Sequence, residues 1–251
     1  MKDNFSQQAS LYAKYRPAYP PELFDFILGP IESKQSAWDC ATGNGQTAKE
    51  LAKHFNKVCA TDISQKQLDN AGQARNIVYS LQPAEGTNFK DDQFDLVTVS
   101  QALHWFDFEK FYAEVKRVTR HGGWIAAWMY GLLSISPEID ELIHHYHFTT
   151  LGDHWDPERK YVDDNYAGIP FPFEPIKTPV FAIRYEWTIE ELEGYFGTWS
   201  ALQKFIAANG FSPVADLMKK IRPYWSKTLG EITEKRNVVF PLHLRMGAVS
   251  K

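Results

Sequence analysis

The feature that most constrains the fold is a glycine turn that follows a short apolar strand and an acidic residue. The strand predicted at residues 37–40 contains Asp39, and the chain then turns through Gly43 and Gly45. A helix pattern and a second apolar strand, which leads to Asp62, follow at once. Strand, acid, glycine turn, helix, strand and acid in this order are typical of a nucleotide site at the carboxyl edge of an α/β sheet.

The first half of the chain continues to alternate between strand and helix patterns. The predicted strands are residues 37–40, 57–61, 77–79, 94–100 and 124–129. The predicted helices are residues 22–28, 46–55, 65–74 and 108–119. Strands separated by helices of this length imply right-handed crossovers and a mainly parallel sheet, so we predict an α/β fold.

This alternation ends after residue 129. A helix pattern over residues 137–151 is followed by a stretch rich in proline, glycine and aromatic residues, in which residues 167–175 cannot form a regular helix. The remaining predicted elements are strands at 180–188 and 237–244 and helices at 190–196, 199–208 and 214–229. We interpret residues 131–179 as a lid inserted over the site. Its aromatic residues are expected to line an apolar pocket or to form the lid's own core; they are Trp155, Tyr161, Tyr166, Phe171 and Phe173.

The length and the 44% hydrophobic content suit one large α/β domain over residues 1–251. We divide it into four parts by their sequence patterns. These are an N-terminal cover segment (1–35), a cofactor-binding core (36–130), the lid (131–179) and C-terminal strands and helices (180–251).

Charge and cysteine content narrow the range of partners. The formal net charge is -4 and the chain lacks a run of Lys and Arg, so we do not expect a nucleic acid partner. Neither an apolar leader nor a run long enough for a membrane span is visible. The two cysteines lie on predicted strands and suit reduced thiols in the cytoplasm. We therefore expect a cytoplasmic protein, a monomer or homodimer, that acts on a small molecule.

The glycine turn matches the dinucleotide fingerprint G-x-G-x-x-A over residues 43–48. However, Asp39 at the strand end would repel a pyrophosphate and attract a cationic amino group. The tyrosine-rich residues 11–21 and the lack of a second nucleotide-binding half also argue against a nicotinamide cofactor. An NAD-dependent oxidoreductase stays an alternative, as does a non-catalytic binding protein that retains the fold.

The sequence resembles the class I S-adenosylmethionine-dependent methyltransferases. Their first motif is Asp-x-Gly-x-Gly-x-Gly, and residues 39–45 follow it except at Ala41, where the family usually has glycine. The other matches are Asp62, residues 93–97 (fourth strand) and residues 114–124 (helix, double glycine and fifth strand). Residues 12–20 and 102–106 narrow the resemblance to the type 11 methyltransferases that are similar to trans-aconitate methyltransferase-like proteins.

This resemblance implies a Rossmann-like, mainly parallel seven-stranded sheet with helices on both faces and an antiparallel last strand. It also implies S-adenosylmethionine as the cofactor and methyl transfer to a small-molecule carboxylate, hydroxyl or amine. A metal is not expected, because the transfer needs none and the neighbouring His144 and His147 lack a partner pattern that would complete a metal site.

The resemblance and the strand ends together predict the cofactor site. Asp39 is expected to contact the methionine amino group and Asp62 the ribose hydroxyls, whereas capping of a turn or helix is the alternative for each. Pro83 stands where the family often has an acid, so Glu85 or the backbone amide of Ala84 is predicted to contact the adenine. The complete predicted cofactor set is Tyr12, Arg16, Asp39, Ala41, Gly43, Gly45, Asp62, Ile63, Ala84, Glu85 and Gln101.

The residues after the fourth predicted strand should face the methyl group. His104 is the candidate for a general base or an orienting hydrogen-bond donor, and packing beside Trp105 is the alternative. Arg16 is expected to pair with a carboxylate of the cofactor or of the substrate, or else to be an ordinary surface arginine.

Overall fold

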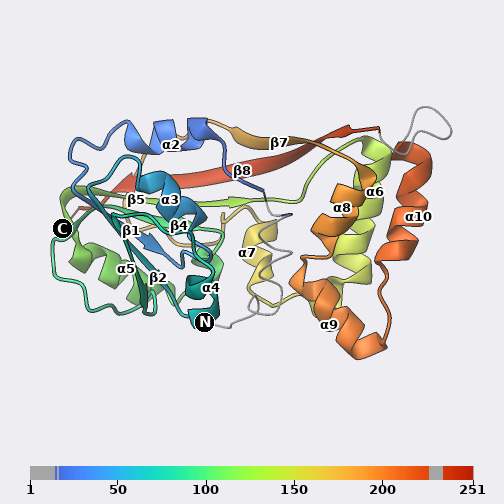
Figure 1. Cartoon of the computed structure of the whole chain (residues 1–251), viewed down its shortest axis with the longest axis horizontal. Coiled ribbons are helices and arrows are strands. Elements are labelled where there is room, and N and C mark those ends of the chain that lie inside the picture. Colours follow the sequence, from blue (N-terminus) through green and yellow to red (C-terminus); the bar gives the residue numbers. More distant parts are fainter. Residues whose placement is uncertain (1–14, 16, 226–233, 251) are drawn as a thin grey trace.

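The computed structural model describes residue 15, residues 17–225 and residues 234–250 of the chain. The described residues form a twisted sheet at one end and a group of helices at the other, joined by two long strands (Figure 1). Within the described residues the sheet has eight strands, in the order β3-β2-β1-β4-β5-β8-β6, with β7 also paired to β8.

The strands of this sheet are mainly parallel. They are β1 (Ser36–Cys40), β2 (Lys57–Asp62), β3 (Ile77–Leu81), β4 (Phe94–Ser100), β5 (Thr119–Tyr130), β6 (Glu174–Pro175), β7 (Phe181–Trp187) and β8 (Arg236–Ala248). Neighbours among β1 to β5 pair in parallel, and β8 runs antiparallel to β5, β6 and β7. The Rossmann-like sheet with an antiparallel last strand is therefore confirmed, and the short β6 adds to the predicted strands.

Helices and helical turns connect these strands. They are α2 (Pro21–Leu28), α3 (Gln46–Leu51), α4 (Gln65–Asp69), η1 (Leu103–Trp105), α5 (Phe108–Val118), α6 (Pro137–His145), η2 (Tyr146–Thr150), η3 (Gly152–His154), α7 (Arg159–Asp163), α8 (Ile189–Phe196), α9 (Ser200–Asn209) and α10 (Val214–Trp225). Local capping explains several starts: the Asp107 carboxylate accepts a hydrogen bond from the Lys110 amide, and Thr188 and Glu191 form a capping box.

Two helices are shorter than the sequence pattern predicts. α3 ends at Leu51 rather than at residue 55, because the last turn tightens and the His54 amide donates to the Leu51 carbonyl. α4 ends at Asp69 rather than at residue 74, because the chain turns back to the glycine turn, where the Gly72 amide donates to the Asn44 carbonyl. Both differences arise from contacts that periodicity does not contain.

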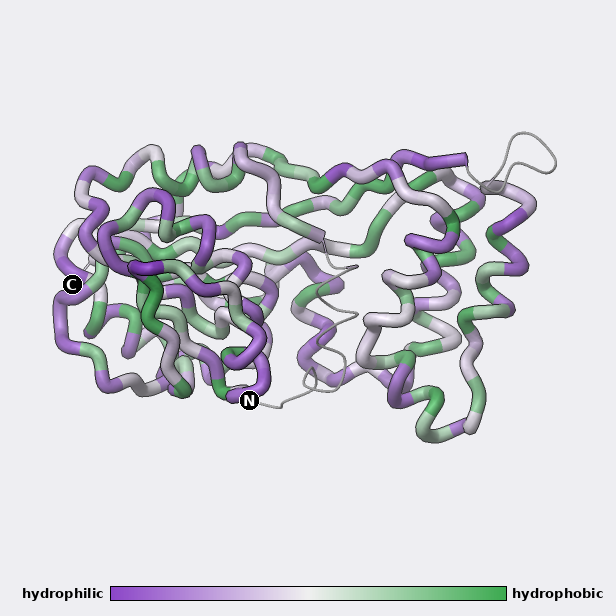
Figure 2. Tube along the Cα trace, viewed as in Figure 1, coloured by the Kyte–Doolittle hydropathy of each residue, from purple (hydrophilic) through white to green (hydrophobic). Residues whose placement is uncertain are grey.

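The helices α6, α8, α9 and α10 gather at the far end of β7 and β8, and we call this group, together with η2 and η3, the cap (Figure 1). α10 packs against α6 and α8, and α9 packs against η3. Along the cap helices hydrophobic and hydrophilic residues alternate, as expected of helices with one buried face (Figure 2). The cap therefore draws on residues from both the predicted lid and the predicted C-terminal part.

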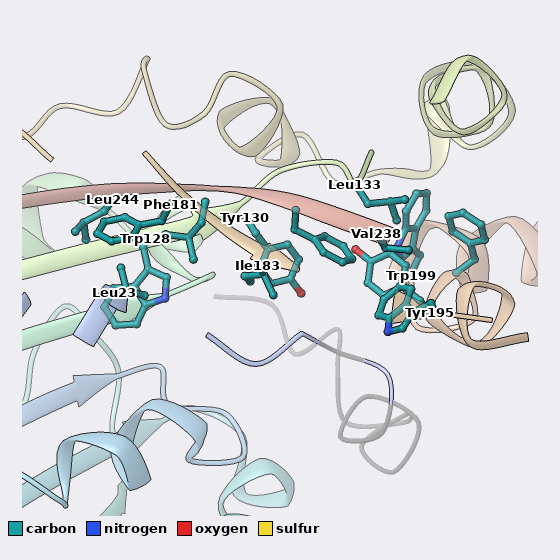
Figure 3. Close-up of a cluster of buried hydrophobic side chains, with 14 of the residues drawn as sticks. Leu23, Trp128, Tyr130, Leu133, Phe181, Ile183, Tyr195, Trp199, Val238 and Leu244 are labelled. Carbon is teal, nitrogen blue, oxygen red and sulfur yellow. The ribbon is translucent and has the colours of Figure 1, made fainter. Parts of the chain in front are cut away.

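One hydrophobic cluster joins the sheet to the cap (Figure 3). It runs from Leu23 of α2 and Trp128 of β5, past Ile183, to Tyr195 and Trp199 in the cap. A second cluster fills the other face of the sheet and includes Trp38, Phe94 and Phe111. Burial of apolar surface in a shared cluster couples the stability of the sheet to that of the cap.

Among residues 15, 17–225 and 234–250, no helix is long and apolar enough to cross a membrane.

Candidate active site

The glycine turn lies at the carboxyl end of β1 and has a left-handed backbone at three positions. The φ angle is 53° at Ala41, 56° at Gly43 and 78° at Gly45. Gly45 precedes the first residue of α3, and a Cβ added there would clash with the hydroxyl of Tyr79. Glycine is thus required at this position both by the backbone and by the close approach of Tyr79.

The other two positions of the turn differ in their surroundings. A Cβ added at Gly43 would meet no atom within 4 Å, so the turn has open space on this side. Ala41 keeps the left-handed conformation despite its Cβ, at a cost of roughly 1–2 kcal/mol. The turn geometry expected from the motif is therefore present, and the strain at Ala41 explains why glycine is usual there.

Asp39 lies beneath the turn and is fully buried. Its Oδ1 accepts a hydrogen bond from the Thr98 hydroxyl (2.8 Å), and its Oδ2 accepts one from the Thr42 hydroxyl (2.5 Å). Burial raises the pKa of Asp39 to about 6, although these bonds and one from the Ala48 amide oppose the shift. Asp39 thus links the turn to β4, and its contact with a cofactor stays a prediction.

Asp62 joins the turn to the start of α4. Its Oδ2 accepts a hydrogen bond from the Gly43 amide and its Oδ1 from the Ser64 amide, each at 2.9 Å. Ser64 itself is the N-cap residue of α4. These two bonds hold the Asp62 carboxylate beside the glycine turn at the carboxyl end of β2. The half-buried Ile63 follows at the same edge of the sheet.

The residues predicted to border the adenine and the methyl group lie after the ends of β3 and β4. Ala84 is buried, Pro83 is exposed, and the Glu85 carboxylate accepts a hydrogen bond from the Asp107 amide at 3.2 Å. Gln101 has a left-handed φ of 56°, and its amide donates to the Trp128 carbonyl at 2.9 Å. The described members of the predicted cofactor set therefore occupy the carboxyl edge of neighbouring strands.

His104 is buried in η1, and its Nδ1 lies 2.9 Å from the hydroxyl oxygen of Tyr166. This contact joins η1 to the predicted lid through two buried side chains. When the Tyr166 hydroxyl donates to Nδ1, the ring hydrogen of the neutral imidazole lies on Nε2. Burial, aided by the charge of Arg159, lowers the pKa of His104 to about 3. Of its two predicted roles, this geometry favours the orienting donor.

The sequence did not single out Tyr166 as a partner of His104. Tyr166 is fully buried, and both it and Asn165 have left-handed φ angles, of 63° and 53°. Arg245 donates to the Tyr166 carbonyl (2.9 Å), and the Tyr112 hydroxyl donates to the Pro170 carbonyl (2.7 Å). This part of the predicted lid is thus fastened to the sheet, by contacts that span many residues of sequence.

The chain ahead of α2 bridges the cap and the sheet. The ring of Tyr15 packs so closely on Gly194 of α8 that a Cβ there would overlap it. The Ala18 amide donates to the Tyr185 hydroxyl at 2.8 Å, and the Tyr19 ring lies edge-on to Trp128 with centroids 5.4 Å apart. Two predicted cofactor residues, Tyr12 and Arg16, lie outside the described residues.

A cavity of about 700 Å³ borders the glycine turn beside the start of α3. Asn44 of the turn and Lys49 of α3 line it, together with the aromatic rings of Tyr19 and Phe24. Space for a small molecule therefore adjoins the turn, between polar groups on one side and aromatic groups on the other.

His144 and His147, which are close in sequence, contact different residues and do not point to a common site. His144 packs on Phe148 with ring centroids 4.4 Å apart, whereas the Nε2 of His147 lies 3.2 Å from the Asp163 carboxylate. Within the described part of the chain, no group of three or more His, Cys, Asp or Glu residues is placed to hold a metal ion.

The chain was compared with known proteins. Residues 38–127 match a protein family described as a methyltransferase domain. A protein of Dictyostelium discoideum that is named as a methyltransferase is 34% identical over 246 residues, which cover 96% of this chain and 93% of that protein. A solved structure from Anaeromyxobacter dehalogenans, described as a type II methyltransferase, has a TM-score of 0.85 and 33% identity and covers 94% of this chain and 98% of its own.

A protein of Saccharomyces cerevisiae named for S-adenosylmethionine-dependent methyl transfer is 25% identical over 174 residues, which cover 64% of this chain and 58% of that protein. Together these findings show that the chain belongs to the S-adenosylmethionine-dependent methyltransferases, and they confirm the class I resemblance. The cofactor of this family is S-adenosylmethionine. The narrower likeness to the trans-aconitate methyltransferase-like proteins stays a prediction.

Proposed function

We propose that the protein transfers a methyl group from S-adenosylmethionine to a small-molecule acceptor. The observation that carries this proposal is the left-handed glycine turn, with Asp62 bonded to the Gly43 amide, at the carboxyl edge of a parallel sheet. The residues present fit the cofactor, because the position of a Cβ on Gly43 is open space and beside it stands a carboxylate, a group that accepts hydrogen bonds from hydroxyls. A carboxylate, hydroxyl or amine acceptor is compatible with this arrangement.

The described residues would contact different parts of the cofactor. Asp62 would accept hydrogen bonds from the ribose hydroxyls, Ala84 and Glu85 would border the adenine, and Asp39 would support the turn beneath the methionine portion. Tyr12 and Arg16 stay predicted contacts. Bound S-adenosylmethionine supplies a methyl group activated by its sulfonium.

The protein must align the acceptor with that methyl group and exclude water. Gln101 and His104 follow β4 and would face the acceptor. His104, whose pKa burial lowers to about 3, is neutral at pH 7 and would orient the acceptor through its Nε2 hydrogen. A group with so low a pKa is a weak base, so an acceptor that is already ionised suits this site best.

Binding of S-adenosylhomocysteine tests the proposal by calorimetry. We expect the intact protein to bind it, and Asp62→Ala to bind it at least roughly tenfold more weakly, because hydrogen bonds to a charged group are lost. Asp69→Ala, which removes an exposed carboxylate at the end of α4, is the matched control and should bind normally. Thermal unfolding of both variants separates lost affinity from lost fold.

An intact protein that releases no heat with S-adenosylhomocysteine would contradict the proposal. A response to NAD in place of S-adenosylhomocysteine would favour the oxidoreductase. Cofactor binding without methyl transfer to any of a broad set of acceptors would favour the binding protein.

A further inference from the structure

Helix α7 lies between the sheet and the cap (Figure 1) and packs against η1, the turn that carries His104. Contacts on both sides fix its position. Ahead of α7, Asp156 pairs with Lys204 of α9 at 2.6 Å, and after it, Tyr166 bonds to His104. The helix is therefore held beside the residues that follow β4, the same edge of the sheet at which the cofactor residues lie.

The side chain of Arg159, the first residue of α7, is held by two neighbours. Its Nε donates to the Asp163 carboxylate at 3.0 Å, and its guanidinium carbon lies 4.6 Å from the centre of the Trp155 ring. The same Asp163 oxygen lies 3.2 Å from Nε2 of the buried His147. An ion pair at one edge and an aromatic ring on one face together fix the plane of the guanidinium.

The opposite edge of this guanidinium has no such partner. In the part of the chain that the structure describes, neither Nη nitrogen of Arg159 has a hydrogen-bond partner, and the side chain keeps 24% of its surface exposed. These two nitrogens carry four of the five donors of an arginine, in the geometry that matches the two oxygens of a carboxylate. A fixed and partly open donor edge of this kind is suited to binding a planar anion.

The positive charge of Arg159 also affects the pKa values of His104, which follows β4, and of its partner Tyr166. It contributes to the lowered pKa of His104, second to burial, whereas Asp163 opposes it. It likewise acts to lower the pKa of Tyr166, against the larger effect of burial. His147 adds no positive charge at neutral pH, because burial lowers its pKa. Arg159 is therefore the positively charged member of the group that it forms with Trp155, Asp163 and His147. Its charge acts on the neutral His104.

We propose that Arg159 binds a carboxylate of the methyl acceptor through its two Nη nitrogens, and that the acceptor is therefore a carboxylic acid. This inference rests on the proposed function and names the substrate class of the same site. Asp163 and Trp155 hold the guanidinium in place, and His104 adds a neutral donor beside it. Arg159 acts here as a specificity-determining residue, because it selects acids over neutral molecules of the same shape.

Binding to the full-length protein saturated with S-adenosylhomocysteine tests this inference. The probes are succinate, phenylacetate and octanoate, each compared by calorimetry with its amide. We expect at least one acid to bind at least tenfold more tightly than its amide. Arg159→Gln should abolish that preference while S-adenosylhomocysteine binds as before. Arg159→Lys should restore it only in part, because a lysine keeps the charge and lacks the planar pair of donors.

Lys160→Gln is the matched control, because it removes one exposed positive charge from the next position of the same helix. It should leave the preference for acids unchanged. Equal binding of acids and amides, binding of none of the three acids, or a preference that survives in Arg159→Gln would each overturn the inference. An intact protein that does not bind S-adenosylhomocysteine would instead contradict the proposed function, so the two failures are distinguishable.

Discussion

The glycine-turn edge of the sheet and the interior of the cap are held together in different ways. At the sheet edge, Asp39 and Asp62 accept hydrogen bonds from Thr42, Gly43 and Ser64, and Asp39 accepts a further one from Thr98 of β4. The cap interior is held by aromatic contacts between distant segments. Examples are the ring centroids of Trp155 and Trp199, at 5.5 Å, and of Tyr146 and Trp199, at 6.0 Å. The polar contacts within the glycine turn can be recognised in the sequence as a motif. The aromatic contacts between distant segments of the cap have no such sequence pattern.

The two regions also differ in how well their buried polar atoms are satisfied. Each carboxylate oxygen of Asp39 accepts a hydrogen bond. In the cap, the Tyr146 hydroxyl and the Nδ1 of His147 are buried and lack a partner among the described residues. Since an unsatisfied buried polar group costs about 1–3 kcal/mol, these two atoms are expected to lower the stability of the cap.

The largest expected effect tests how tightly the sheet edge is closed around Asp39. Burial raises the pKa of this group from 3.8 to about 6, so the folded protein holds the proton more tightly than the unfolded chain. The resulting stability is present below pH 3.8 and is lost as the pH rises through about 6, a loss of about 3 kcal/mol. Asp39→Asn should remove this loss, as measured by urea unfolding from pH 4 to 7.

Asp69→Asn is the control for that experiment, because Asp69 is exposed at the end of a helix. It should keep the pH dependence of the unchanged protein. A slope in Asp39→Asn as steep as that of the unchanged protein would show that Asp39 is hydrated rather than closed off.

A smaller effect is expected at the joint between the two regions, where Tyr166 meets His104. Tyr166→Phe removes the hydroxyl and leaves Nδ1 of His104 without its donor, so the free energy of unfolding should fall by about 2 kcal/mol. Nitrogen NMR of the histidine ring should show the hydrogen on Nε2 in the unchanged protein and a mixture of tautomers in the variant. Tyr161→Phe, nearby in the predicted lid, should change neither quantity. Equal behaviour of the two variants would mean that the hydroxyl of Tyr166 does not orient His104.

The same contrast explains what the sequence could predict. The positions of most strands, the turn and the place of Asp62 at the end of a strand follow from periodicity and from spacing within one motif. The roles of Tyr166 and Arg159 were not predictable in this way, because the first depends on a contact with residue 104 and the second on α7 packing against η1. Proline and glycine residues around α7 obscure its helix pattern in the sequence. The contacts of α7 come from distant residues of the sheet and the cap. Propensity and local spacing contain no information about such pairs.

The smallest effect tests whether the sheet edge stores strain of its own. Ala41 has a φ of 53°, whereas Ala52 at the end of α3 has an ordinary φ of -63°. Ala41→Gly should raise the free energy of unfolding by less than about 1 kcal/mol, because the relief of a left-handed alanine exceeds the entropy that glycine adds to the unfolded chain. Ala52→Gly should lower it, since glycine adds entropy to the unfolded chain and removes a methyl group that packs against the core. Urea unfolding measures both. Opposite signs would place the strain in the turn itself, and a loss in both variants would show that Ala41 adopts its conformation without cost.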